Sequence, residues 1–234
     1  MPATRERLIM ALDVPDTTQA RALVEQLDTS VAFYKVGLEL FMADGFFALV
    51  DWLKARDKKV FVDLKLFDVP ATVGRAVARL AARDIDFVTV HGNQGIMQAA
   101  AAASSGNLQI LAVTALTSLD QGDLDELGFQ CDVGALVLSR ARRALAAGCA
   151  GVVSSGMEVA ALRRHAPDRL IAVTPGIRPV ANDDDQKRVM TPADAIAAGS
   201  DYLVVGRPIR DANDPRAAAD DIQAEIQQAL ADKD

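Results

Sequence analysis

The sequence predicts an α/β fold, in the form of a single (β/α)8 TIM barrel that takes up residues 1–234. Three observations predict it: eight short apolar segments alternate with helical patterns, the chain is 234 residues long, and polar residues recur where the apolar segments end. Such alternation is typical of a parallel sheet, and a barrel of about 250 residues accommodates eight strands and their helices. A doubly wound open sheet is the alternative, but no glycine-rich fingerprint follows the first strand.

The predicted strands are short, apolar and mostly bounded by charged residues, glycine or proline. They cover residues 8–13, 32–37, a stretch beginning at residue 60, and residues 87–92, 109–114, 151–153, 170–174 and 202–205. Helical periodicity predicts helices over residues 17–27, 39–56, 71–83, 96–103, 120–127, 133–147, 157–165, 192–198 and 215–230. The second helix is expected to bury Leu40, Phe47 and Val50, and the third to begin near Pro70.

Composition and charge exclude several classes of function. Half of the residues are hydrophobic, 24% are charged and the net charge is -7, which is ordinary for a globular protein. No cluster of Lys and Arg offers the basic face that a nucleic acid needs, although a few basic groups can still bind a small anion. No apolar run reaches the roughly 18 residues of a membrane span. Without a signal peptide, Cys131 and Cys149 are expected to be reduced thiols in a cytoplasmic protein.

The chemistry is predicted to centre on the end of the third strand. Asp63 and Lys65 lie two residues apart, so their side chains would point to the same side of an extended backbone, and Asp68 follows in the next loop. An ion pair that caps a strand is the simpler interpretation. A lysine between two carboxylates, however, stays protonated, and it can donate a proton to a carbanion.

Polar residues also follow the other predicted strands. In a barrel of this type the carboxyl ends of the strands form the active site. The residues that the sequence places there are Asp13, Lys35, Asp63, Lys65, His91, Thr117 and Arg207. A single polar residue after a strand is usually a solvated loop residue. The recurrence of polar residues at this position around the barrel favours a functional site. His91 is interpreted as a hydrogen-bonded structural residue rather than as an acid.

Two glycine-arginine segments follow the seventh and eighth strands, where barrels commonly bind phosphate. They are Thr-Pro-Gly-Ile-Arg at residues 174–178 and Val-Gly-Arg-Pro-Ile at residues 205–209. Glycine allows the backbone to approach phosphate oxygens, and arginine adds several donors. The segments predict a phosphorylated small-molecule substrate. The polar stretch at about residues 177–190 is either a surface loop or a lid over that phosphate.

These segments together resemble the bacterial orotidine 5'-phosphate decarboxylase family. The resemblance rests on Asp-Leu-Lys-Leu-Phe-Asp-Val-Pro-Ala-Thr at 63–72, Ala-Leu-Asp at 11–13, Tyr-Lys-Val-Gly at 34–37 and the two glycine-arginine segments, and it spans about residues 8–215. The Asp-x-Lys-x-x-Asp core is shared with sugar-phosphate relatives such as hexulose-phosphate synthase. The two glycine-arginine segments are more similar to those of the decarboxylases.

The resemblance implies a homodimeric barrel that converts orotidine monophosphate to uridine monophosphate and carbon dioxide in pyrimidine biosynthesis, with no metal or organic cofactor. It implies that Lys65 protonates C6 of the pyrimidine within a charged tetrad with Lys35, Asp63 and Asp68, and that Asp68 comes from the partner subunit. The implied substrate contacts are Asp13 and Thr72 at the ribose, with Thr72 also across the dimer, Thr117 near the pyrimidine, and Arg178, Gln186, Gly206 and Arg207 at the phosphate. Lys35 is also implied to bind the substrate.

Three other functions remain open at the level of sequence. Lys65 could form a Schiff base in an aldolase-like barrel, although its acidic neighbours oppose this by keeping the amine protonated. Asp63 could bind magnesium with other carboxylates, as in the sugar-phosphate relatives. A non-enzymatic binder of a phosphorylated ligand would explain the two glycine-arginine segments, but not the charged residues around Lys65.

Overall fold

Eight parallel strands form a closed barrel in the computed structural model, which describes residues 2–165, 170–179 and 189–233. The strands are β1 (Leu8–Ala11), β2 (Phe33–Gly37), β3 (Lys59–Leu66), β4 (Phe87–His91), β5 (Gln109–Val113), β6 (Gly151–Val153), β7 (Ile171–Thr174) and β8 (Tyr202–Val205). They follow one another around the barrel in chain order, and β1 pairs with both β2 and β8. The predicted barrel is therefore confirmed, since an open sheet would leave two strand edges unpaired.

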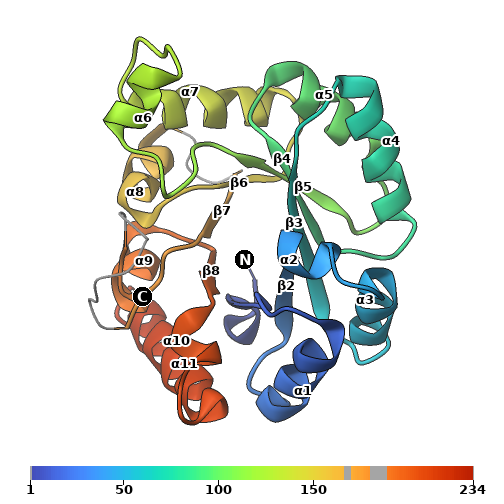
Figure 1. The fold of residues 1–234 in the computed structure, drawn as a ribbon. Helices are drawn as coiled ribbons and strands as arrows, with labels where there is room; N and C mark the ends of the chain where they lie inside the picture. The colour runs from blue at the N-terminus through green and yellow to red at the C-terminus, as the bar shows by residue number, and fades with distance from the viewer. Residues whose placement is uncertain (1, 166–169, 180–188, 234) are drawn as a thin grey trace.

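The helices lie outside the ring of strands (Figure 1). They are α1 (Thr17–Leu27), α2 (Leu38–Phe41), α3 (Phe46–Lys54), α4 (Pro70–Ala81), α5 (Gln94–Ala103), α6 (Gln121–Glu126), α7 (Val133–Ala146), α8 (Gly156–His165), α9 (Pro192–Ala198), α10 (Arg207–Arg210) and α11 (Pro215–Ala231), after a short 3₁₀ turn at Thr4–Glu6. Aspartates cap several of them; Asp16, for example, accepts a hydrogen bond from the backbone N–H of Gln19 at 2.8 Å. Among the described helices, none is long and apolar enough to cross a membrane.

The predicted helix over residues 39–56 is wrong as a single element. The chain forms α2 and α3 instead, because Gly45 takes a left-handed conformation (φ 83°) that interrupts the helix. The break changes which aromatic side chain is buried: Phe46 is 4% exposed, whereas Phe47, expected in the core, is 39% exposed. The four-residue helix α10 was also not predicted, since it is too short to show a period.

Alternate residues of each strand pack on the two sides of the barrel wall. Leu8 and Met10 of β1 point toward the helices, and Ile9 and Ala11 point into the barrel. The interior is filled largely by aromatic side chains, which meet at ring-centroid distances of 5.1 to 6.0 Å; they are Phe33, Phe61, Phe87 and Tyr202. This packing makes the barrel interior a solid core, so a ligand of the barrel binds at an end of the strands and not inside it.

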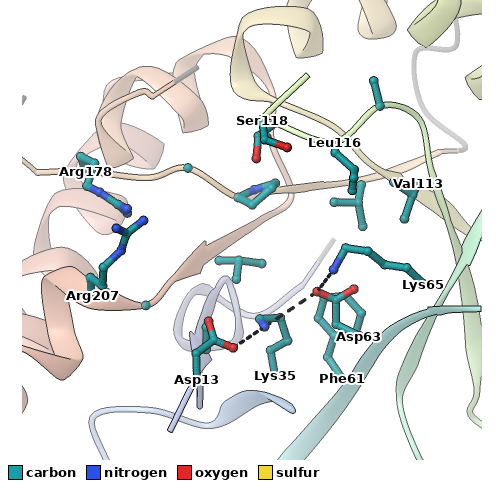
Figure 2. Close-up of a pocket in the computed structure, with 18 of the residues that line it drawn as sticks. Asp13, Lys35, Phe61, Asp63, Lys65, Val113, Leu116, Ser118, Arg178 and Arg207 are labelled. Carbon is teal, nitrogen blue, oxygen red and sulfur yellow. Dashed lines mark hydrogen bonds and ion pairs between the residues drawn. The ribbon is translucent and has the colours of Figure 1, made fainter. Parts of the chain in front are cut away.

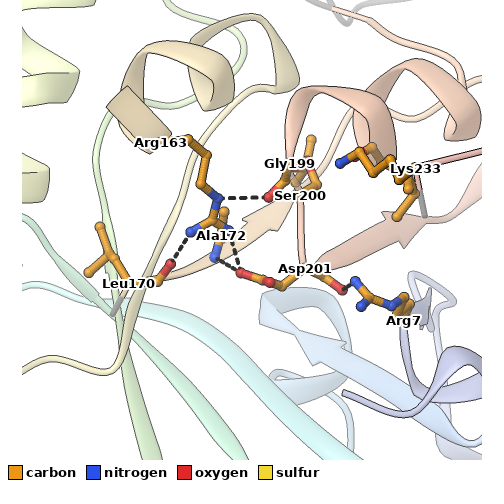
Figure 3. Close-up of polar contacts among 10 residues, drawn as sticks. Arg7, Arg163, Leu170, Ala172, Gly199, Ser200, Asp201 and Lys233 are labelled. Atoms are coloured by element: carbon orange, nitrogen blue, oxygen red, sulfur yellow. Dashed lines mark hydrogen bonds and ion pairs between the residues drawn. The ribbon is translucent and has the colours of Figure 1, made fainter. Parts of the chain in front are cut away.

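A polar cluster holds β7 and β8 together at the amino ends of these strands (Figure 3). Asp201 accepts hydrogen bonds through one carboxylate oxygen from Arg163 at 2.5 Å and from the backbone N–H of Ala172 at 2.8 Å. The same guanidinium donates to the carbonyl groups of Leu170 and Gly199. Because β7 and β8 lead into the two glycine-arginine segments, this cluster sets the positions from which those segments begin.

Candidate active site

A row of alternating charges crosses the carboxyl ends of the first three strands (Figure 2). Asp13 follows β1, Lys35 lies in β2, and Asp63 and Lys65 lie in β3. The ammonium of Lys35 is 2.9 Å from Asp13 Oδ1 and 3.8 Å from Asp63 Oδ2, and the ammonium of Lys65 is 2.8 Å from Asp63 Oδ2. The structure thus brings together four of the residues that the sequence predicted.

Asp63 is the most enclosed carboxylate of this row. Its residue is 9% exposed, and Thr89 of β4 donates a hydrogen bond to its Oδ1 at 2.7 Å. Burial acts to raise the pKa of Asp63, but the positive charges of Lys35 and Lys65 and the hydrogen bonds from Lys65 and Thr89 outweigh it and lower the pKa below its usual range. Asp63 is therefore ionised at neutral pH, with both oxygens already engaged by cations or donors.

Space for the ammonium of Lys35 depends on Gly37. A Cβ added to Gly37 would lie 3.2 Å from Lys35 Nζ and 3.6 Å from Asp13 Oδ1. A larger residue would therefore press on the ion pair between Lys35 and Asp13. The absence of a side chain at Gly37 therefore leaves room for this ion pair.

The extended geometry expected for Asp63 and Lys65 is wrong in one respect. β3 does not end before these residues but continues to Leu66, and the pairing of β3 with β4 shifts register between Val62 and Leu66. Lys65 itself has φ 47°, a left-handed conformation that costs a residue other than glycine about 1 kcal/mol or more. Simple alternation along a strand therefore does not explain how Lys65 reaches Asp63; a local bulge does.

A pocket of about 440 Å³ opens beside the row of charges at the carboxyl ends of the strands. Its floor includes Ala11, Phe61 and Val204 from the top of the barrel core. The predicted residues that line it are Asp13, Lys35, Asp63, Lys65, Thr117, Arg178, Gly206 and Arg207. Leu116, Ser118 and Arg210 also line it and were not predicted, since nothing in the local sequence distinguishes them from ordinary loop residues.

Two arginines lie across the pocket from Lys65. Arg178 follows β7 and Arg207 begins α10 after β8, and in Figure 2 their guanidinium groups point toward one another. Arg178 is 6% exposed, and its guanidinium donates to the carbonyl of Ile177 at 2.9 Å. Both arginines line the pocket, and guanidinium groups are good donors to phosphate oxygens, so this end of the pocket suits a phosphate group.

The stretch at about residues 177–190, predicted as a lid or surface loop, is described only at its two ends. Arg178 N–H donates to the carbonyl of Met190 at 2.9 Å, and Met190 N–H donates to the carbonyl of Gly176 at 3.1 Å. These bonds hold both ends of the stretch at the rim of the pocket. Gln186, a predicted phosphate contact, lies outside the described residues.

Asp68 and Thr72 are not part of the pocket formed by their own chain, as far as the described residues define it. Asp68 is exposed and its Oδ1 accepts a hydrogen bond from the backbone N–H of Val69 at 2.6 Å. Thr72 lies in the first turn of α4, where its hydroxyl accepts a hydrogen bond from Arg75 at 3.1 Å. Among the described residues of one chain, therefore, Lys65 is paired with Asp63 and not held between two carboxylates.

His91 lies at the end of β4 with its ring against Phe67, at a centroid distance of 4.8 Å. Burial lowers the pKa of His91, and the positive charges of Arg140 and Lys65 lower it further. The imidazole is therefore neutral at pH 7. It does not line the pocket defined by the described residues.

Sequence comparison places the chain among known proteins. Residues 6–222 match the orotidine 5'-phosphate decarboxylase / HUMPS family. The chain is 66% identical over 228 residues to an orotidine 5'-phosphate decarboxylase of Methylococcus capsulatus, with 97% of this chain and 94% of the relative covered. It is 54% identical over 224 residues to the enzyme of that name from Afipia carboxidovorans, with 95% of each covered.

A solved structure agrees with the sequence comparison. The crystal structure of orotidine 5'-phosphate decarboxylase from Lactobacillus acidophilus superposes with a TM-score of 0.83 at 35% identity, and the match covers 94% of this chain and 99% of that one. The resemblance seen in the motifs therefore extends to the entire fold. Accordingly, the chain belongs to the orotidine 5'-phosphate decarboxylase / HUMPS family.

Proposed function

We propose that this protein decarboxylates orotidine 5'-monophosphate to uridine 5'-monophosphate in pyrimidine biosynthesis, without a metal or organic cofactor. The observation that carries the proposal is the pocket itself, which has the ammonium of Lys65 at one end and Arg178 and Arg207 at the other. A nucleotide fits this arrangement, because its phosphate and its reacting base lie at opposite ends of the molecule. The names of the curated relatives support the same substrate.

In the proposed reaction, the bond between C6 of the pyrimidine and its carboxylate carbon breaks, and the electron pair stays on C6 as carbon dioxide leaves. The ammonium of Lys65 stabilises this developing negative charge and then gives its proton to C6, so that a C–H bond forms and a neutral amine remains. Preorganised charge of this kind is usually the largest contribution to catalysis. The amine then regains a proton from solvent.

Asp63 has two roles in this proposal. Its Oδ2 is 2.8 Å from the Lys65 ammonium and 3.8 Å from that of Lys35, so it fixes both cations. As an ionised group beside the place where the substrate carboxylate would lie, it also disfavours the charged ground state relative to the transition state. Its engaged oxygens argue against the magnesium alternative, because a metal would have to displace Lys65 or Thr89.

The proposal extends to a homodimer in which Asp68 and Thr72 enter the partner's pocket. Both residues lie outside their own pocket, on the loop and first helical turn after β3. The neighbouring side chains of Phe67 and Val69 are 66% and 63% exposed. Adjacent apolar side chains left in solvent are typical of an interface, and this loop would bring the acidic and hydroxyl groups across with it.

The direct test is to mix the purified protein with orotidine 5'-monophosphate and to follow the loss of the substrate's ultraviolet absorbance, with uridine 5'-monophosphate identified as the product. We expect turnover that survives treatment with a chelator. Loss of activity on chelation would instead favour the magnesium enzyme. Tight binding of the nucleotide without turnover would favour a phosphate-ligand binder, and both results would contradict the proposal.

Replacing Arg207 with alanine should mainly weaken the binding of phosphorylated substrate. A hydrogen bond to a charged group contributes about 1.5 to 3 kcal/mol, so kcat/KM for orotidine 5'-monophosphate should fall at least about tenfold. Steady-state kinetics with the nucleotide and with orotidine, which lacks the phosphate, measure the effect. Arg142→Ala removes an equal charge from an exposed position on α7 and is the matched control. An equal loss with orotidine would show that Arg207 does not bind phosphate.

A further inference from the structure

Thr89 is a fully buried polar residue in the middle of strand β4, and its hydroxyl lies between two parts of the site. It donates to Asp63 Oδ1 at 2.7 Å and accepts a hydrogen bond from the backbone N–H of Lys65 at 3.0 Å. Thr89 is 0% exposed and does not line the pocket. It therefore contacts the catalytic row from behind, on the side away from substrate.

The bulge in β3 explains why Lys65 needs a side-chain partner. Between the paired positions, β3 advances four residues from Val62 to Leu66, while β4 advances only two, from Val88 to Val90. The intervening residues of β3 leave the regular ladder, and Lys65 adopts its left-handed conformation there. The hydroxyl of Thr89 accepts a hydrogen bond from the backbone N–H of Lys65, which a regular ladder would otherwise satisfy. A buried N–H without a partner is rare in folded proteins.

A single hydroxyl can make both contacts in only one arrangement. It carries one proton, and Asp63, held as a carboxylate between Lys35 and Lys65, can only accept. The proton of Thr89 therefore points to Asp63, and an oxygen lone pair accepts from the N–H of Lys65. The orientation of the Asp63 carboxylate and the backbone conformation at Lys65 are thus coupled through one atom.

We propose that Thr89 is a positioning residue for the decarboxylation, which holds Asp63 and the bulged backbone of Lys65 in the one arrangement that places the ammonium at the reacting carbon. The inference rests on the proposed function for its chemistry, and on the two hydrogen bonds for its geometry. Thr89 acts through Asp63 and Lys65, and it would not touch the substrate. Its loss should therefore affect turnover much more than binding.

Two substitutions separate hydrogen bonding from packing. Thr89→Val keeps the shape of the side chain and removes the hydroxyl, whereas Thr89→Ser keeps the hydroxyl and removes a methyl group. Loss of a buried hydrogen bond to a charged group should lower kcat about 10- to 100-fold in the valine variant, with KM changed less than about threefold. The serine variant should keep kcat within about threefold of the unaltered protein. A purely structural residue would affect both variants through stability and would not separate kcat from KM.

A pH profile supplies a second readout. Asp63 is faced by Lys35 from β2, by Lys65 from β3 and by Thr89 from β4, with Asp13 beyond Lys35 and His91 near Lys65. The hydrogen bond from Thr89 helps to lower the pKa of Asp63, so its removal raises that pKa. Because Asp63 must be ionised for turnover, the acid limb of the kcat profile should move to higher pH in Thr89→Val and stay in place in Thr89→Ser.

The experiment measures kcat, KM, the pH profile and the thermal midpoint for the unaltered protein and both variants. If Thr89→Val does not fold, Thr89→Ala, which removes the hydroxyl without adding bulk, replaces it with the same expectation. Equal losses in the serine and valine variants, or a valine variant with unchanged kcat, would overturn the role of Thr89. If the unaltered protein does not decarboxylate the nucleotide, the proposed function fails. Crystal structures of the variants then test the positioning role of Thr89 by geometry alone. A Lys65 that keeps its position in Thr89→Val would overturn that role.

Discussion

Lys65→Ala is expected to lower kcat at least about 10⁴-fold, since the substitution removes both the charge that stabilises the C6 carbanion and the proton that quenches it. The fold should survive. Lys65 lies at the pocket with its side chain 33% exposed, and Asp63 keeps Lys35 and Thr89 as partners when the Lys65 ammonium is gone. Turnover followed by absorbance, together with thermal unfolding, measures the two effects separately.

A matched control lies at the other end of the same strand. Lys59 in β3 forms an ion pair with Glu6 at 2.6 Å, far from the pocket, so Lys59→Ala removes an ion-paired lysine without touching the site. That variant should turn over at close to the normal rate. An inactive Lys59→Ala variant, or a Lys65→Ala variant that is unfolded or still active, would contradict the role of Lys65 as proton donor.

Two inactive variants are expected to restore activity when their subunits are mixed. If Asp68 serves the partner's pocket, Lys65→Ala and Asp68→Ala homodimers each have a defect in every site. A heterodimer then contains one pocket with both defects and one pocket with neither. Random exchange of equal amounts places about half of the chains in heterodimers, so about a quarter of the normal activity should return. Activity and subunit exchange are measured on the same mixture.

The mixing experiment also has a clear negative result. If subunit exchange is demonstrated and no activity returns, Asp68 must act in its own barrel and the shared site has to be abandoned. Two variants that alter the same pocket serve as the control: Lys65→Ala mixed with Lys35→Ala should show no recovery, because the heterodimer then has one defect in each pocket. A recovery in this control would indicate that the measured activity has another source.

The role of Lys65 as proton donor and the sharing of the active site between subunits depend on different parts of the molecule. Its chemistry depends on the row of charges within one chain, where Lys65 pairs with Asp63 at 2.8 Å. The shared site depends on the exposed loop that carries Asp68, beside the exposed side chains of Phe67 and Val69. Lys65→Ala alone therefore tests the first proposal, and the mixed dimers test the second.

The sequence by itself determined the barrel and most of the polar residues around its rim. Eight short apolar segments and their spacing are local features, and a strand buried on both faces shows itself as a nearly continuous apolar run. Asp13, Lys35, Asp63 and Arg207 could be predicted as neighbours because parallel strands bring their carboxyl ends to one edge. Periodicity failed at Gly45, where a single left-handed residue divides the expected helix and leaves Phe47 exposed.

Only the tertiary structure decided how Lys65 is presented to the pocket. Its left-handed conformation arises from a shift in register between two strands, and that shift depends on pairing between β3 and β4, not on residues near Lys65 in the chain. The role of Thr89 could not be predicted from the sequence, because threonine is common in strands. Its hydroxyl becomes significant only where the fold brings Asp63 and Lys65 into contact with it. Local patterns predict which residues reach the rim; the contacts between strands determine where their charges point.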